Sequence, residues 1–202
     1  GTVLAGSNNF FEVECEDGVR TCSLKGKILK SGTQYYNPLA PGDVVEVECG
    51  EDEDAKGRII SLVPRKNEFV RWNVKGRCPQ LLAANVDYVV LVTTPDYPPF
   101  RPRFIDRELA QIESLGLVPV IVCNKYDLIE ESTDSKLVAL TERYLNIWEE
   151  LGYRVLRISA KTGEGIPEFA MLLENHLSAF VGQSGAGKSS LINVLDETCV
   201  LK

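Results

Sequence analysis

The most informative stretch of this chain lies near its C-terminal end and reads Gly182-Gln183-Ser184-Gly185-Ala186-Gly187-Lys188-Ser189. It matches the phosphate-loop pattern GxxxxGK(S/T) at every position. An apolar run, residues 179–181, precedes it, and a segment with helical spacing, residues 189–195, follows. A strand, a glycine-rich turn and a helix in this order direct backbone N–H groups toward phosphate oxygens. The sequence therefore predicts a phosphate-binding site in which Lys188 reaches the terminal phosphates, Ser189 offers its hydroxyl to Mg²⁺, and Ser190 extends the loop.

The residues before this loop alternate between apolar runs and segments with helical spacing. Apolar runs at 86–92 and 118–123 are typical of strands buried on both faces of a parallel sheet, and a further strand is expected at 154–158. Helical spacing occurs at 103–115, 135–151 and 166–173. Such alternation predicts a doubly wound parallel sheet that binds ligands at the C-terminal ends of its strands. The expected buried face of the helix at 135–151 comprises Leu137, Leu140, Tyr144, Leu145, Trp148 and Leu151.

A second motif, Asn124-Lys125-Tyr126-Asp127, comes directly after the strand that ends at Cys123. An aspartate in this position accepts two hydrogen bonds from guanine, one from its ring N–H and one from its exocyclic amine. Adenine presents no such pair of donors, so a buried carboxylate facing it would be left unpaired at considerable cost. We expect Asp127 to read the base, Asn124 to brace the surrounding loops, and the stem of Lys125 to lie over the base plane.

A third motif, Ser159-Ala160-Lys161, also follows a predicted strand. The backbone N–H of Ala160 is placed to donate to the guanine oxygen, where adenine would present an amine. Each short motif is weak evidence alone, but all three lie at the C-terminal ends of strands. Together they predict a guanine-nucleotide site.

The N-terminal part of the chain has the pattern of short antiparallel strands. Residues 10–15, 43–49 and 57–63 alternate apolar and polar side chains or are bounded by glycine and proline turns. Several short strands without a helical segment predict a small barrel over residues 1–66. An OB-fold is favoured, and an SH3-like barrel remains the alternative because strand pattern alone does not separate the two.

Basic residues gather where the barrel ends, in a stretch whose single acid is Glu68. They are Lys56, Arg58, Arg65, Lys66, Arg71, Lys75 and Arg77. Residues 67–85 are expected to be a basic linker between two domains. Charge runs are usually solvated surface, but this one also suits contacts with RNA phosphates, with Trp72 available to stack on a base. The residues alone leave both interpretations open.

Composition limits the class of protein. Hydrophobic residues make up 44% of the chain and charged residues 25%, which is ordinary for a soluble globular protein. The net charge of −7 argues against a surface that grips nucleic acid everywhere. No apolar run approaches the roughly 20 residues of a membrane span. The six cysteines include no CxxC pair and there is one histidine, His176, so reduced thiols in a cytoplasmic protein are expected rather than a zinc site.

The order of the motifs is unusual, because the guanine motif at 124–127 precedes the phosphate loop at 182–189. This reversed order, with a barrel in front, resembles the circularly permuted GTPases of the RsgA/YjeQ type. The resemblance covers nearly the whole chain and extends beyond the three nucleotide motifs. It includes Pro64-Arg65-Lys66-Asn67, Ala83-Ala84-Asn85-Val86-Asp87 and Phe104-Ile105-Asp106-Arg107.

The resemblance implies a GTPase that assists maturation of the small ribosomal subunit. It implies an OB-fold at 1–66 that contacts rRNA, the basic linker at 67–85, and a circularly permuted α/β P-loop GTPase domain at 86–202. It also favours the RNA interpretation of the basic residues. The expected ligands are GTP or GDP with Mg²⁺, and the protein is expected to be a cytoplasmic monomer without a membrane partner.

The chain departs from this family after the phosphate loop. Family members continue into a switch segment, a DxxG motif and a C-terminal zinc module, and none of these follows Lys188. We therefore expect a C-terminally truncated chain that binds nucleotide without efficient hydrolysis, with zinc only in the missing module and no catalytic residue assigned. Two alternatives are an ATP-using P-loop enzyme and an RNA-binding module with a vestigial nucleotide site. The intact Lys188 and Ser189 argue against the second.

Overall fold

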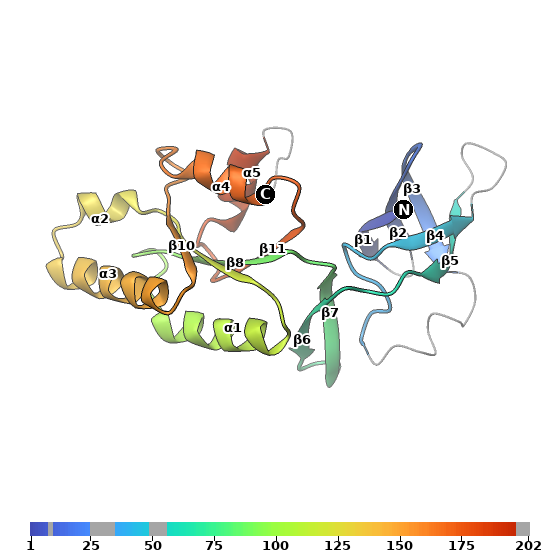
Figure 1. Cartoon of the computed structure of the whole chain (residues 1–202), viewed down its shortest axis with the longest axis horizontal. Helices are drawn as coiled ribbons and strands as arrows, with labels where there is room; N and C mark the ends of the chain where they lie inside the picture. The colour runs from blue at the N-terminus through green and yellow to red at the C-terminus, as the bar shows by residue number, and fades with distance from the viewer. Residues whose placement is uncertain (8–9, 25–34, 49–55, 197–202) are drawn as a thin grey trace. The chain divides into compact units, whose positions relative to one another are not determined.

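The computed structural model describes residues 1–7, 10–24, 35–48 and 56–196. The chain forms two compact units, Gly1–Val86 and Asp87–Lys202. The first is built of strands, and the second alternates strands and helices (Figure 1). Among the helices within the described ranges, none combines the length and apolar character that a membrane span requires.

The first unit contains a five-stranded barrel. Its strands are β1 (Thr2–Ser7), β2 (Phe10–Cys15), β3 (Gly18–Leu24), β4 (Val45–Glu48) and β5 (Gly57–Leu62). They pair in the order β1-β2-β3-β5-β4, with β3 and β5 parallel and the other pairs antiparallel. A bridge between Thr2 and Val44 returns the sheet to β1 and closes the ring. This closed arrangement is that of an OB-fold, so the favoured prediction is confirmed over the SH3-like alternative.

The strands of the barrel alternate apolar and polar residues, so that one face of each strand lines the interior. In β2, Phe11 and Val13 are buried while their neighbours Phe10 and Glu12 are exposed. Facing strands supply matching apolar side chains to the interior. The buried set is Val3, Phe11, Val13, Cys22, Leu39, Val45 and Ile59.

The expected linker at 67–85 forms a β-hairpin instead. Strands β6 (Glu68–Asn73) and β7 (Cys78–Ala84) pair antiparallel within the first unit. Phe69 and Leu81 are buried, which gives the hairpin an apolar face that a solvated linker would lack. The first unit therefore extends through the hairpin, and its boundary lies one residue beyond the boundary expected after residue 85.

The second unit is a four-stranded parallel sheet in the order β10-β9-β8-β11. Its strands are β8 (Tyr88–Thr93), β9 (Pro119–Cys123), β10 (Arg154–Arg157) and β11 (Ser178–Gly182). The strands lie where the sequence predicted them, and the apolar runs of β8 and β9 are buried as expected. Within the described residues β11 pairs with β8 only, so it is an edge strand, and its residues are half-buried.

Helices cover both faces of this sheet, with α1 and α3 on one side and α4 and α5 on the other (Figure 1). The helices are α1 (Pro102–Ser114), α2 (Asp127–Glu131), α3 (Ser135–Glu150), α4 (Ile166–Leu173) and α5 (Lys188–Leu195). Alternate strand residues face opposite sides. Val90 and Val122 pack in one cluster with Phe169 of α4 and Leu191 of α5.

Helix α3 begins at an N-cap, Asp134, whose side chain accepts the backbone N–H groups of residues 136 and 137. Its buried residues are Thr141, Leu145 and Trp148. Leu140 and Leu151, which the spacing placed on the buried face, are 41% and 68% exposed. The spacing therefore predicted the helix correctly. It predicted too wide a buried face, because Leu140 and Leu151 are not covered by the sheet.

Candidate functional site

The predicted nucleotide motifs gather at one edge of the parallel sheet. Residues 124–127 follow β9, residues 159–161 follow β10, and the phosphate loop follows β11. Because parallel strands all end at the same edge, segments that are up to 62 residues apart in sequence become neighbours. Side-chain contacts then join them.

Asn124 joins all three motifs. Its side chain is buried, its Nδ2 donates to the carbonyl of Ala186 at 3.0 Å, and its Oδ1 accepts the backbone N–H of Ala160 at 3.1 Å. Both ends of the amide are thus used, one on the phosphate loop and one on the loop after β10. This is the bracing geometry expected of Asn124.

The Ala160 contact differs from the expectation. Its N–H, expected to donate to a guanine oxygen, donates to Asn124 Oδ1 in the structure. Reading a guanine oxygen therefore requires Ala160 to share its N–H between two acceptors.

Two glycines of the phosphate loop are required by close approach to protein atoms. A Cβ on Gly187, whose φ is +89°, would lie 2.3 Å from Asn124 Nδ2. A Cβ on Gly182 would lie 2.3 Å from the carbonyl oxygen of Val92. A side chain at either position would collide with Asn124 or with the backbone of Val92, and the phosphate-binding pattern alone does not reveal these contacts.

Asp127 is the first residue of α2 and is only 6% exposed. Its Oδ1 accepts the hydroxyl of Ser159 at 2.7 Å, and its Oδ2 pairs with Lys161 Nζ at 3.2 Å. Two side chains of the loop after β10 therefore orient this buried carboxylate.

The charge state of Asp127 follows from the same contacts. Burial acts to raise the pKa of this carboxyl, but the hydrogen bonds from Ser159 and Lys161 outweigh it and hold the pKa below its ordinary value. Asp127 is therefore an anion at neutral pH, which is the form that accepts hydrogen bonds from a base.

Lys161 also pairs with Glu131 at the end of α2, at 3.2 Å. Hydrogen bonds to Glu131 and then to Asp127 raise the pKa of Lys161. The sequence analysis missed Glu131, although its place four residues after Asp127 on a helix puts the two carboxylates on one face. Both acids thus hold Lys161, and with it the loop after β10, against α2.

Lys125 adopts a left-handed backbone, with φ of +59°, and its side chain reaches the phosphate loop. Its Nζ donates to the carbonyl of Gly185 at 2.9 Å and to the carbonyl of Tyr97. Tyr97 belongs to the turn after β8, in which Thr94 Oγ1 donates to the carbonyl of Pro98 at 2.9 Å. The sequence analysis missed this turn, although prolines directly after a buried strand mark it.

Tyr126 connects the guanine motif to α3. Its hydroxyl donates to Glu142 Oε1 at 2.6 Å, and Arg157 of β10 lies 3.6 Å from the other oxygen of Glu142. Burial, together with the bond to Glu142, raises the pKa of Tyr126 to about 12. The hydroxyl therefore stays protonated and donates throughout the physiological range. Tyr126 is a second residue that sequence reasoning missed, since the motif allows any side chain there.

The side chain of Lys188 folds back onto the start of the phosphate loop. Its Nζ donates to the carbonyls of Gly182 and Gln183, at 2.9 and 2.8 Å. Ser189 and Ser190 are exposed in the first turn of α5. A lysine and a serine hydroxyl are thus adjacent at the point where the loop becomes a helix.

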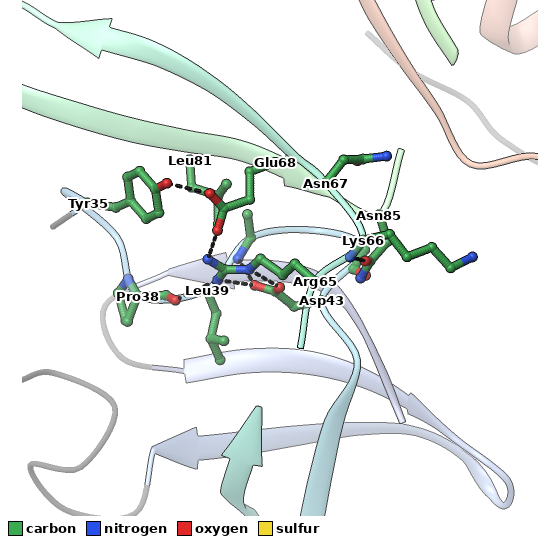
Figure 2. Close-up of polar contacts among 12 residues, drawn as sticks. Tyr35, Pro38, Leu39, Asp43, Arg65, Lys66, Asn67, Glu68, Leu81 and Asn85 are labelled. Atoms are coloured by element: carbon green, nitrogen blue, oxygen red, sulfur yellow. Dashed lines mark hydrogen bonds and ion pairs between the residues drawn. The ribbon is translucent and has the colours of Figure 1, made fainter. Parts of the chain in front are cut away.

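Of the predicted RNA-facing residues, six are exposed and one is not. The exposed residues are Lys56, Arg58, Lys66, Arg71, Lys75 and Arg77. The side chain of Arg65 is 8% exposed and lies between the carboxylates of Asp43 and Glu68 (Figure 2). Its Nε is 2.6 Å from Asp43 Oδ1, and its Nη1 is 2.8 Å from Glu68 Oε1. Arg65 therefore holds the hairpin to the barrel and is withdrawn from the set of RNA-facing residues.

The chain is similar in sequence and in fold to proteins of one family. The model of the RsgA GTPase family matches residues 62–202. The chain is 38% identical over 198 residues to the small ribosomal subunit biogenesis GTPase RsgA of Borrelia recurrentis strain A1, covering 96% of this chain and 60% of that protein. It is 36% identical over 207 residues to the RsgA of Flavobacterium johnsoniae, covering 100% and 62%.

Two solved structures share the fold. YjeQ from Thermotoga maritima superposes with a TM-score of 0.77 at 32% identity, covering 100% of this chain and 66% of that one. The circularly permuted GTPase YloQ superposes with a TM-score of 0.70 at 28% identity, with the same coverage. The chain spans about 60% of the length of the two curated relatives above.

Proposed function

The chain belongs to the RsgA GTPase family, and from this premise we propose that it binds GTP and GDP as part of a GTPase that assists maturation of the small ribosomal subunit. The two curated relatives carry that activity in their names. Because the chain spans only part of their length, hydrolysis and the ribosomal partner are proposed for the whole protein.

The contacts of Asn124 are the observation that carries the proposal. One side chain bonds the phosphate loop through Ala186 and the loop after β10 through Ala160, while Asp127 of the same motif bonds Ser159. An ATP-binding loop has no need of such a connection, since the phosphate loop alone does not choose a base. The connection supports a site that recognises guanine and phosphate together.

Within this site each motif has a distinct role. Asp127 accepts the ring N–H and the exocyclic amine of guanine, and the stem of Lys125 lies along the base. Lys188 and the backbone N–H groups of the loop bind the phosphates. The complete set proposed to bind nucleotide is Asn124, Lys125, Asp127, Ser159, Ala160, Lys161, Gly182, Gln183, Ser184, Gly185, Ala186, Gly187, Lys188, Ser189 and Ser190.

Mg²⁺ is proposed to bind with the nucleotide at Ser189. In the part of the chain that the structure describes, no cluster of three or more His, Cys, Asp or Glu side chains could hold a metal. Mg²⁺ in nucleotide sites takes one or two protein ligands and completes its shell with phosphates and waters. When bound, it would neutralise charge on the phosphates. The exposed hydroxyl of Ser189, beside Lys188, is the ligand this chain offers.

We further propose a cytoplasmic monomer without a membrane partner, whose barrel unit contacts rRNA. The exposed residues Lys56, Arg58, Lys66, Arg71, Lys75 and Arg77 are the proposed contacts. Salt-dependent binding to small ribosomal subunits, strengthened by GTP, is the outcome expected of the whole protein.

Titration with a fluorescent GDP analogue tests the nucleotide site directly, with unlabelled GTP and ATP as competitors. We expect GTP to compete and ATP not to compete. Asp127→Asn should lose the preference for guanine, because an amide cannot accept both guanine donors. Glu130→Gln is the matched control, since Glu130 is an exposed acid of the same helix and lies outside the proposed set. Equal competition by ATP would remove the guanine proposal.

A further inference from the structure

The tip of the β6–β7 hairpin carries exposed aromatic and apolar side chains. Trp72 is 59% exposed and Val74 is 80% exposed. Tyr36, from the segment before β4, is 63% exposed and lies at the same tip, since its N–H donates to the carbonyl of Pro79 at 2.8 Å. Its ring also approaches Gly76, where a Cβ would be 2.9 Å from the ring. Two aromatic rings from separate segments are thus presented to solvent together.

The charge around these rings is of one sign. Arg71, Lys75 and Arg77 are exposed, and residues 69–82 contain no acid, although the chain as a whole carries a net charge of −7. Among the described residues, no ion pair includes any of these three cations. By contrast Arg65, at the base of the hairpin, is paired twice. The tip is therefore a local cationic surface with its charges available.

The tip has a defined conformation. Asn73 Oδ1 accepts the N–H of Gly76 at 2.9 Å, and Asn73 Nδ2 donates to Gln80 Oε1 at 3.2 Å. Trp72 stands opposite Pro79 in the strand register. Because the backbone is already fixed, a ligand would order side chains only, which lowers the cost of binding.

These features together suit one class of partner. Flat rings exposed among unpaired cations bind nucleotides whose base faces are open, by stacking and phosphate contact. An RNA duplex presents phosphates and hydroxyls but keeps its base faces covered, so it would leave both rings without a partner. We propose that the hairpin tip binds unpaired RNA nucleotides, with Trp72 and Tyr36 stacking on bases and Arg71, Lys75 and Arg77 contacting phosphates. This inference rests on the proposed function in taking RNA as the partner, and it locates a contact outside the barrel strands.

Tryptophan fluorescence provides a direct test, because the chain has two tryptophans in opposite environments. Trp148 is 1% exposed and its Nε1 donates to Asp106 at 2.9 Å, so RNA cannot reach it. An eight-nucleotide oligoadenylate should quench the Trp72 emission and leave that of Trp148. In anisotropy titrations with labelled oligoadenylate, Trp72→Ala should weaken binding about tenfold, in the range of one lost stacking contact. Trp72→Phe should keep most of the affinity and abolish the quenching.

A matched pair of arginine variants tests the proposed phosphate contacts. Arg77→Ala should make the slope of log K against log salt shallower by about 0.7, the value for one phosphate contact on a single strand. Arg143→Ala, an exposed arginine of α3 without an ion pair among the described residues, should leave the slope unchanged. Equal binding of a duplex RNA without quenching, or wild-type affinity of Trp72→Ala, would overturn the proposal.

Two further measurements separate this inference from the proposed function. GDP affinity and the far-ultraviolet circular dichroism spectrum of the same variants should equal those of the wild type, which shows that both the nucleotide-binding unit and the strand-built unit are folded. If the wild type binds GDP and small ribosomal subunits but the tip variants bind subunits equally well, only the hairpin inference fails. If the wild type binds neither, the proposed function itself fails.

Discussion

Asn124 and Arg65 are both buried polar side chains that join segments far apart in the sequence, but they do so with opposite chemistry. Asn124 is neutral and connects the phosphate loop to the loop after β10 through two hydrogen bonds. Arg65 is charged and connects the barrel to the hairpin through two ion pairs and a bond to the carbonyl of Pro38 (Figure 2).

The carboxylates beside them show what the difference means. Asp43 receives Arg65 Nε on one oxygen, and Arg65 Nη2 and the N–H of Ala40 on the other, and its side chain is fully buried. Asp127 accepts the hydroxyl of Ser159 on one oxygen and pairs with Lys161 on the other, and it lies where the nucleotide motifs meet. Asp43 therefore joins parts of the fold, whereas Asp127 is the carboxylate that we propose binds a ligand.

Asp43→Ala should have the largest effect. It leaves the guanidinium of Arg65 buried with one partner fewer, which costs about 3 kcal/mol or more of unfolding free energy. Urea denaturation followed by circular dichroism measures the loss. Asp17→Ala, which breaks an exposed pair with Arg20, should not move the midpoint. Equal effects of the two variants would contradict a structural role for the Arg65 cluster.

Asn124→Ala should come next, and its effect should appear in nucleotide binding. It leaves the carbonyl of Ala186 and the N–H of Ala160 without their partner, so GDP should bind about thirtyfold more weakly, or about 2 kcal/mol. Fluorescent GDP titration measures this. Asn146→Ala removes an exposed amide bonded to Arg157 and should bind GDP as the wild type does. An unchanged affinity in Asn124→Ala would show that the motifs hold their positions without it.

Gly187→Ala should have a somewhat smaller effect through the same residue. The added Cβ meets Asn124 Nδ2 and the left-handed backbone is strained, so GDP affinity should fall about tenfold, or about 1.4 kcal/mol. Gly152→Ala matches the backbone, with φ of +92°, but has no neighbour within 4 Å and should leave GDP affinity unchanged.

The double variant sharpens this test. If Gly187→Ala acts through Asn124, combining it with Asn124→Ala should cost less than the sum of the two single losses, because the clash has gone. Strict additivity would show that backbone strain alone accounts for the effect of Gly187→Ala.

Tyr35→Phe should have the smallest effect and should depend on pH. Burial acts to raise the pKa of Glu68, but hydrogen bonds from Tyr35 and Arg65 hold it below its ordinary value. A lowered pKa in the folded state stabilises the protein above the unfolded pKa, and this stabilisation is lost as pH falls through the folded pKa.

The variant should therefore lose at most about 1 kcal/mol of unfolding free energy at neutral pH. Solvent screening reduces this loss because Glu68 is partly exposed. The difference from wild type should shrink as the carboxyl becomes protonated. Urea midpoints measured from pH 7 down to the acid limit test this. A difference that stays constant across that range would exclude Glu68 as the partner through which Tyr35 acts.

The nucleotide motifs were predictable because each is local. Cys123 ends a buried run and Asn124 begins a polar one, so the strand end and the motif are read from adjacent residues. Since parallel strands end at one edge, three such local readings were enough to assemble the predicted site. The strands and helices of the second unit were predictable for the same reason, except for the short helix α2.

The hairpin and the Arg65 cluster were not predictable because their evidence is not local. A register shift between Phe69 and Val70 breaks the alternation of β6, and the mixed aromatic and basic residues that follow suggest a linker. The buried partner of Arg65, Asp43, lies 22 residues earlier, and the nearby Glu68 is, within one residue, as close in sequence to the exposed Lys66 as to Arg65.

The sequence by itself determined the fold class, the order of the nucleotide motifs and the family, because these depend on short patterns and their positions along the chain. Only the tertiary structure decided which charged side chains are exposed to a partner. Arg65 is paired with Asp43 and Glu68, whereas Arg71 and Arg77 are exposed to solvent. The tertiary structure also decided that Ala160 bonds Asn124 and that Gly187 must lack a Cβ. The physical reason is that ion pairing and close approach depend on distances between segments remote in sequence, which folding alone sets.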